Sequence, residues 1–312
     1  MIVAVCSDKG APGGTTLAVA LGMVWPGPRA VVEADVAGGD LALRVRSESG
    51  DFLTSTPSLA SLSTAARMAT ADPMAHAQLT SLQVPVVAGP PSARRFRAVR
   101  STWPVVASSL AAWPGTAIAD LGRLDAGLPS VPVTQAATVA LLVTRYDVEG
   151  LARLRDRVDE QSVLPAPTDD GRTRVGVVVV APSRQVGEAI AETQKVLDSV
   201  GSPVPVAGAV AWDPRSASAL WAGVVTRRLA GGELIRSTRT LAESIMTRWP
   251  EVAAAAVTGS SSDDAADSVP PNPAGERRPL FRGRRRQRPV GGSAGDTAVN
   301  EGPVTVSREV SS

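Results

Sequence analysis

Short apolar runs of strand length alternate with helix-length segments along most of the chain, and this alternation restricts the fold more than any other feature. A strand, a helix and a further strand in repeated order are typical of a parallel sheet covered by helices. The expected strands are residues 2–6, 30–36, 84–88, 117–121, 139–144, 174–181 and 205–211. The expected helices are residues 15–25, 58–70, 92–112, 148–161, 184–200 and 236–249. We therefore predict an α/β fold with a mostly parallel sheet and helices on both faces.

The composition supports an aliphatic core and excludes several classes of protein. Of the 312 residues 44% are hydrophobic but only 3% are aromatic, and the formal net charge of +2 indicates neither nucleic acid nor membrane as a partner. The single cysteine, Cys6, forms no internal disulfide and fits a reducing compartment. No apolar run approaches the roughly 18 residues of a membrane span, and residues 1–6 are typical of a strand rather than a secretory signal. We expect a cytoplasmic protein without a stable metal site.

The composition changes near residue 251, where Ser, Gly, Pro and Asp replace the apolar runs. We expect a folded domain over residues 1–250 and a disordered tail over residues 251–312. Within the tail, residues 277–288 (RRPLFRGRRRQR) contain seven arginines and no acid. Such a segment could bind an anionic membrane or nucleic acid. A solvated linker is the alternative.

A glycine-rich stretch, SDKGAPGGTT, follows the first expected strand and precedes a helix. A phosphate-binding P-loop has the pattern G-x-x-x-x-G-K-[ST], but here Gly14 stands in place of the lysine before Thr15. Backbone N–H groups and the helix dipole would still converge on a phosphate at this point. The expected nucleotide contacts are Gly10, Ala11, Pro12, Gly13, Gly14, Thr15 and Thr16.

Carboxylates follow two further expected strands. In VVEADVAGGDLAL, Glu33 and Asp35 lie two residues apart, on one side of the strand end, and Asp40 follows two glycines. In TAIADLG, Asp120 closes an apolar strand. Carboxylates at this edge can orient a water or hold hydrated magnesium, with the Thr15 hydroxyl as a ligand. An aspartate at a strand end is otherwise a common turn former.

The stretches KGAPGGTT, VVEADVAGGDLAL, AIADLG and VAWDPRSASALWAG together resemble the ParA/MinD superfamily of deviant-Walker ATPases. The resemblance implies that Lys9 is the signature lysine, which crosses a nucleotide-sandwiched dimer to the partner's phosphates. It implies that Asp35 orients the attacking water, that Asp40 belongs to the adjacent switch, and that Thr15 and Asp120 hold magnesium. Lys9 and Asp35 are thus the expected catalytic residues.

The stretch EADVAGGDLAL is most similar to the CpaE/TadZ-like branch, whose members localise and assemble Tad-type pili. The resemblance to the ParA/MinD superfamily covers about residues 1–249 and implies ATP and Mg²⁺ as cofactors and a homodimer. It also implies a partner protein of a pilus, secretion, partition or polar assembly, and a location at the membrane or cell pole.

Three departures from the family pattern argue against robust ATP hydrolysis. Gly14 removes the lysine that contacts the β- and γ-phosphates, Glu33 replaces the first aspartate of D-x-D, and Ala181-Pro182 stands where relatives usually have an adenine-reading asparagine. If the protein is an enzyme, it is an ATP hydrolase.

Three functions stay open. The first is a positioning or scaffold protein with a degenerate nucleotide site, and the second is a competent partition ATPase that uses Lys9 in trans. The third is a nucleic-acid or lipid adaptor that acts through its arginine-rich tail. Conversion of Gly14 to lysine separates the first two, because only a crippled site gains from the added charge.

The histidine and three tryptophans carry smaller expectations. His76 is expected on the surface rather than in catalysis. Trp212 and Trp221 flank DPRSASAL, where core filling is favoured over an interface or base-stacking role. Trp249 ends an apolar helix stripe that is expected to pack on the sheet.

Overall fold

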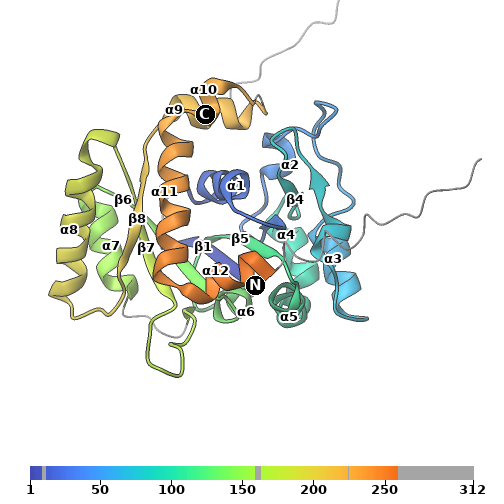
Figure 1. Ribbon diagram of the computed structural model, residues 1–312. Coiled ribbons are helices and arrows are strands. Elements are labelled where there is room, and N and C mark those ends of the chain that lie inside the picture. The colour runs from blue at the N-terminus through green and yellow to red at the C-terminus, as the bar shows by residue number, and fades with distance from the viewer. Residues whose placement is uncertain (9–11, 159–162, 224, 259–312) are drawn as a thin grey trace, which may run out of the picture. The chain divides into compact units, whose positions relative to one another are not determined.

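The computed structural model describes residues 1–8, 12–158, 163–223 and 225–258, which form an eight-stranded sheet with helices on both faces (Figure 1). The strand order is β3-β4-β2-β5-β1-β6-β7-β8. All neighbouring strands are parallel except β3 and β4. The strands are β1 Ile2–Ser7, β2 Arg29–Glu33, β3 Gln78–Leu79, β4 Pro85–Val87, β5 Thr116–Arg123, β6 Val139–Arg145, β7 Val175–Ala181 and β8 Val206–Ala211. The predicted α/β fold is confirmed.

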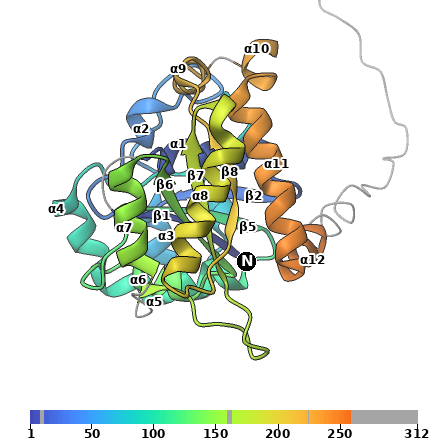
Figure 2. The same ribbon diagram turned by 90° about the vertical axis from the view of Figure 1, so that its left-hand side faces the viewer.

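Long helices cover the two faces of the sheet, as Figures 1 and 2 show from two directions. One face carries α1 Gly14–Val24, α11 Glu233–Arg248 and α12 Pro250–Thr258. The other carries α3 Leu59–Ala66, α5 Trp103–Ala112, α7 Val148–Val158 and α8 Val186–Ser199. Shorter helices join these elements: α2 Leu41–Arg44, α4 Ala93–Phe96, α6 Val131–Gln135, α9 Pro214–Trp221, α10 Arg227–Ala230, and the 3₁₀ turns η1 Pro73–His76, η2 Arg97–Thr102 and η4 Ser183–Gln185.

Each face of the sheet packs into its own hydrophobic core. Along the central strand β1, Ile2 and Ala4 belong to one core, whereas Val3 and Val5 belong to the other. Successive side chains of a strand point to opposite faces, so a strand covered on both sides is apolar at every position. This accounts for the continuous apolar runs in the sequence.

Two predicted elements differ from the structure in a way that affects the site. The strand predicted over residues 30–36 ends at Glu33, so Asp35 lies in the loop that follows β2. The helix predicted over residues 92–112 is divided into α4, η2 and α5. Pro104 lies in the first turn of α5, where its missing N–H and fixed φ favour a helix start.

The composition change near residue 251 does not mark the end of ordered structure. Residues 251–258 were expected in the tail, but α12 continues to Thr258 and buries Val252 and Ala256 in the core of one face. Alanine is the best helix former, and the run EVAAAAVT uses it for a helix rather than a linker. The arginine-rich segment 277–288 lies outside the described residues. Among the helices that the structure describes, none has the length and apolar character needed to cross a bilayer.

Candidate functional site

The N-terminus of α1 is open and positively polarised. Gly13 precedes the helix in a left-handed conformation (φ 103°), and no side chain of the described residues caps the first turn, which itself contains no acid. The first N–H groups of a helix have no acceptor within the helix. Those of Gly14, Thr15 and Thr16 are therefore available to donate to an anion. A Cβ atom placed on Gly13 would meet nothing within 4 Å. The end of this helix is therefore accessible to a phosphate.

Asp120 lies in the second half of β5, beside this helix start, and is 1% exposed. Its Oδ1 accepts a hydrogen bond from the N–H of Gly122 at 3.2 Å, whereas its buried Oδ2 has no hydrogen-bond partner among the described residues. Burial raises the pKa of Asp120 to about 6, and the nearby Thr15 hydroxyl opposes this shift. A buried carboxylate oxygen without a partner, beside a threonine hydroxyl, is a set of hard oxygen donors that suits Mg²⁺.

Asp35 reaches the same region from the loop after β2. Its Oδ1 accepts a hydrogen bond from the N–H of Ala37 at 2.8 Å. A Cβ atom on Gly122 (φ 58°) would lie 2.2 Å from the Asp35 carboxyl carbon, so only glycine permits this approach. Burial raises the pKa of Asp35, whose charge in turn raises the pKa of Asp120. The tertiary structure thus gathers Thr15, Asp35 and Asp120, which come from three separate stretches of sequence.

Glu33 does not share this arrangement. It is 2% exposed, and its carboxylate accepts hydrogen bonds from the N–H groups of Leu41 (2.7 Å) and Gly89 (2.8 Å). A Cβ atom on Gly39 would lie 2.4 Å from its Oε2. Burial raises the pKa of Glu33 to about 7, although both backbone donors lower it. Glu33 therefore clamps two backbone segments together, and the expectation that it faces a ligand beside Asp35 is wrong.

Asp40 is exposed at the start of α2. Its carboxylate forms an ion pair with Arg44 at 2.8 Å, one helical turn later. The loop of residues 35–40 is further held by a hydrogen bond from the N–H of Gly39 to the Pro90 carbonyl at 2.9 Å. Asp40 thus lies next to the site without pointing into its buried part.

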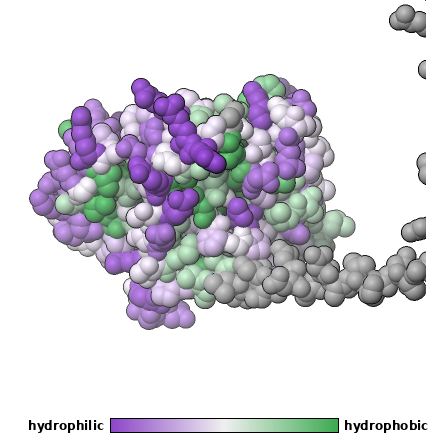
Figure 3. Space-filling model, turned by 45° about the horizontal axis from the view of Figure 1, so that its top comes forward, coloured by the Kyte–Doolittle hydropathy of each residue, from purple (hydrophilic) through white to green (hydrophobic). Residues whose placement is uncertain are grey.

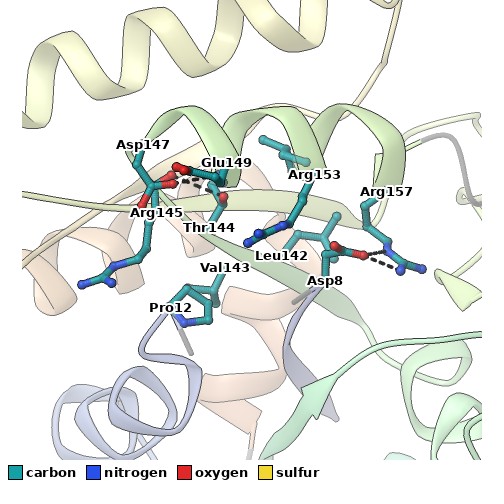
Figure 4. Close-up of a pocket in the computed structure, with 12 residues that line it drawn as sticks. Asp8, Pro12, Leu142, Val143, Thr144, Arg145, Asp147, Glu149, Arg153 and Arg157 are labelled. Atoms are coloured by element: carbon teal, nitrogen blue, oxygen red, sulfur yellow. Dashed lines mark hydrogen bonds and ion pairs between the residues drawn. The ribbon is translucent and has the colours of Figure 1, made fainter. Parts of the chain in front are cut away.

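A cavity of about 330 Å³ separates the glycine-rich loop from α7 (Figure 4). Arg145 and Arg153 extend toward the side of the cavity where Pro12 lies. On its other side the Arg157 Nε donates to the Asp8 carboxylate at 2.9 Å, and Arg157 is only 8% exposed. Because Asp8 directly precedes Lys9, this ion pair fixes the start of the loop to α7.

Sequence reasoning missed the Asp8–Arg157 pair. A charged residue on an amphipathic helix is expected to face solvent, and the two residues are 149 positions apart. No local pattern therefore indicated the contact. Lys9, Gly10 and Ala11 lie outside the described residues, so their roles stay predictions.

Trp212 occupies the surface near the same helix start. It is 48% exposed, and the Arg145 guanidinium carbon lies 4.2 Å from the centre of its ring. A small apolar pocket of about 70 Å³ lies between Trp212 and the first turn of α1, including Gly13 and Thr16. The favoured core-filling interpretation is wrong for Trp212, which is half exposed beside the candidate nucleotide site with the Arg145 guanidinium over its ring.

The burial of Trp221, Trp249 and His76 tests the remaining expectations. Trp221 is half-buried, with Arg44 5.4 Å from its ring centre. Trp249 is 2% exposed and packs on the sheet as predicted, with its Nε1 donating to the Thr173 carbonyl at 2.9 Å. His76 is half-buried rather than fully exposed, and its Nδ1 lies 2.9 Å from the Ser61 hydroxyl, outside the candidate site.

Comparison with solved structures identifies this arrangement of strands and helices. A ParA family ATPase from Chlorobium tepidum TLS superimposes with a TM-score of 0.60 at 17% identity, covering 78% of this chain and 97% of that chain. The chain has the ParA/MinD fold. The septum site-determining protein MinD from Pyrococcus horikoshii OT3, solved with Mg-ADP, gives a TM-score of 0.55 at 20% identity and covers 78% of this chain and 95% of its own.

A third structure with the ParA/MinD fold is pNOB8 ParA bound to nonspecific DNA. Its TM-score is 0.51 at 14% identity, with coverage of 80% of this chain and 98% of that chain. No protein-family model and no curated protein sequence matches the chain. The likeness is thus one of fold, and it extends over nearly the whole length of each compared structure.

Proposed function

We propose that this protein is a ParA/MinD-like positioning or scaffold protein that binds Mg-ATP weakly and hydrolyses it slowly or not at all. The observation that carries the proposal is the buried Oδ2 of Asp120, which has no hydrogen-bond partner within 3.5 Å among the described residues and lies near the Thr15 hydroxyl at the start of α1. These groups suit a magnesium ion and a phosphate, but Gly14 brings no cation to them. The site thus has the oxygen donors of a nucleotide site but lacks the positive charge that a P-loop lysine provides.

Each residue of the candidate site would have a separate part in binding Mg-ATP. The N–H groups of Gly14, Thr15 and Thr16 would donate to phosphate oxygens, and the Thr15 hydroxyl and Asp120 would hold Mg²⁺, directly or through water. The bound ion would neutralise phosphate charge. Asp35 lies where it would orient a water molecule, because Gly122 lets it approach the end of β5.

The missing lysine would account for the weak ATP binding and slow hydrolysis that we propose. A charge-assisted hydrogen bond contributes roughly 1.5–3 kcal/mol, so its loss weakens binding by about tenfold to a hundredfold. The loss is larger in a transition state where charge develops on the phosphate.

The scaffold role requires a partner and a second copy of the chain. We propose a homodimer in which Lys9 reaches across to the partner's nucleotide, as the resemblance to the ParA/MinD superfamily implies. Exposed apolar side chains support such an interface: Leu43, Phe52 and Val225 are each more than half exposed. Figure 3 shows apolar surface between hydrophilic side chains on the face that includes the upper end of the molecule in Figure 1. Recruitment of a pilus, secretion, partition or polar assembly, at the membrane or cell pole, completes the proposal.

Substitution of Gly14 by lysine tests the proposal. A Cβ atom at this position would meet only Val5, at 3.9 Å, so the backbone accommodates a side chain. We expect Gly14→Lys to bind a fluorescent ATP analogue about tenfold or more tightly than the wild type and to release phosphate faster. Gly14→Ala is the matched control, since it adds the Cβ without the charge.

A second substitution shows whether the gain depends on the magnesium site. In a Gly14→Lys background, Asp120→Asn should remove the Mg²⁺ dependence of binding. If the wild type hydrolyses ATP as fast as Gly14→Lys, the protein is a competent ATPase and the proposal fails.

A competent partition-type ATPase is the second candidate, and the gathering of Thr15, Asp35 and Asp120 in one place favours it. In that case Lys9 of one copy supplies the missing charge to the other. Turnover per protein molecule would then rise steeply with protein concentration, and Lys9→Ala would abolish it. A scaffold with a crippled site shows neither effect.

A further inference from the structure

An exposed arginine cluster follows β4, outside the candidate nucleotide site. Arg94 and Arg95 lie on α4, and Arg97 and Arg100 on η2, and all four are exposed. No acidic residue occurs in the sequence between Asp72 and Asp120. No ion pair joins any of the four to another residue that the structure describes.

The packing of Phe96 and the Ser92 cap hold the backbone that carries the four arginines. Phe96 is buried between the arginines and stacks on Trp103, with ring centroids 6.1 Å apart and planes 5° from parallel. Ser92 caps α4 by accepting from the N–H of Arg95. These contacts hold the backbone, and the exposed guanidinium groups have no carboxylate partner in the part of the chain that the structure describes.

The helices next to the cluster carry no charged residue that would neutralise it or extend it. η2 packs against α3 and α5, neither of which carries a charged residue. The acids of the loop after β2 are already engaged, Asp40 by Arg44 and Asp35 by the N–H of Ala37. Positive charge is therefore concentrated on one short segment and is not neutralised locally.

We propose that this arginine cluster docks an acidic segment of a partner protein. Residues three apart in a 3₁₀ turn are eclipsed and about 6 Å apart along its axis, as are Arg97 and Arg100. Alternate residues of an extended chain are separated by about 6.6 Å and point the same way. An extended segment with an acid at every second position therefore matches the spacing and the charge of the cluster.

Two other anionic partners fit the surface less well. A duplex binder that makes 6–10 phosphate contacts needs a broader basic surface than four arginines flanked by uncharged helices. A membrane surface needs apolar side chains beside the charges, whereas α4 and η2 expose no large apolar side chain and the nearest one in sequence, Val105 on α5, is 38% exposed.

The surface is also linked to the loop after β2. The N–H of Gly39 donates to the Pro90 carbonyl at 2.9 Å, and a Cβ atom on Gly38 would lie 3.1 Å from the Ser92 Cα. A docked segment would thus lie one backbone contact away from Asp35 and Asp40. The proposal goes beyond the nucleotide-binding function and does not depend on it.

Fluorescence anisotropy with a labelled (Glu-Ser)₅ peptide tests the proposal on the full-length protein without nucleotide. We expect the triple variant Arg94→Glu, Arg97→Glu, Arg100→Glu to bind the peptide at least about tenfold more weakly than the wild type, because three ion pairs are replaced by three repulsions. The triple variant with Gln at the same positions should lose less. A (Gln-Ser)₅ peptide should not bind.

The matched control reverses three exposed arginines of α11, Arg236, Arg239 and Arg248, which changes the net charge by the same amount. This control should change peptide affinity by less than about twofold, since distant exposed charges are screened by salt. Equal losses in both triple variants would overturn the proposal, as would no loss in the cluster variant. A larger loss of binding to a 20-base-pair duplex or to phosphatidylserine vesicles than to the peptide would assign the surface to nucleic acid or membrane instead.

Discussion

Glu33 is a buried carboxylate that joins the loop before α2 to the end of β4. Its two oxygens accept from the N–H groups of Leu41 and Gly89. Burial nevertheless dominates and raises its pKa to about 7 from the ordinary 4.5. The folded state therefore holds a proton that the unfolded state has released, between about pH 4.5 and 7. Stability from this group is present at low pH and is lost as the pH rises through 7.

The pH dependence of unfolding tests this assignment. Between pH 6 and pH 8 the titration of Glu33 should lower the free energy of unfolding by about 1 kcal/mol. Glu33→Gln should remove this slope and also cost about 1–3 kcal/mol, because the amide nitrogen cannot accept from a backbone N–H. Urea denaturation of both proteins across this pH range measures the difference. An unchanged slope in Glu33→Gln would show that other groups carry the pH dependence.

At the scale of elements, the contact between α7 and the glycine-rich loop depends on one buried ion pair. Arg157 is nearly buried, and the Asp8 side chain is 25% exposed. Removal of one member leaves the other partly desolvated, which is costly, whereas removal of both costs less. The pair thus couples the position of the loop to α7, the helix that also lines the cavity beside the loop.

A double-mutant cycle measures this coupling. We expect Arg157→Leu to destabilise the protein by about 2 kcal/mol, and Asp8→Asn combined with Arg157→Leu to recover part of that loss, giving an interaction energy of about 1–3 kcal/mol. Arg155→Leu on the exposed face of α7 is the control, with an expected change within about 0.5 kcal/mol. Additive single effects would mean that the ion pair does not fix the loop.

At the scale of the whole molecule, the proposed homodimer would depend on exposed apolar residues. Phe52 is 52% exposed beneath the Arg46 guanidinium, which lies 3.6 Å from its ring centre, and Leu43 is 63% exposed on α2. Glutamate at both positions should abolish Mg-ATP-dependent dimerisation in analytical ultracentrifugation, since charge at an interface core is strongly unfavourable. Met68→Glu alters a residue that is 87% exposed on the other face of the sheet and should leave association unchanged. Dimerisation by the Leu43→Glu, Phe52→Glu variant would place the interface elsewhere.

The sequence by itself determined the layered fold and the order of its parts. Strands buried on both faces must be apolar at every position, and helices packed on one side must be amphipathic, so both patterns are local and can be read without a structure. The start of α1 after the glycines was predictable for the same reason, and so was the apolar strand that carries Asp120, although β5 continues beyond it to Arg123. Trp249 followed from its position on an apolar helix stripe.

Only the tertiary structure decided what the polar residues do. Glu33 and Asp35 are two residues apart and looked equivalent, but the early end of β2 sends one to backbone donors and the other toward Gly122. The Asp8–Arg157 pair and the contact of Arg145 with Trp212 join residues far apart in the sequence. A charged or aromatic side chain acquires its partners from whatever the fold places beside it. Such contacts leave no periodic pattern in the sequence, so only the tertiary structure reveals them.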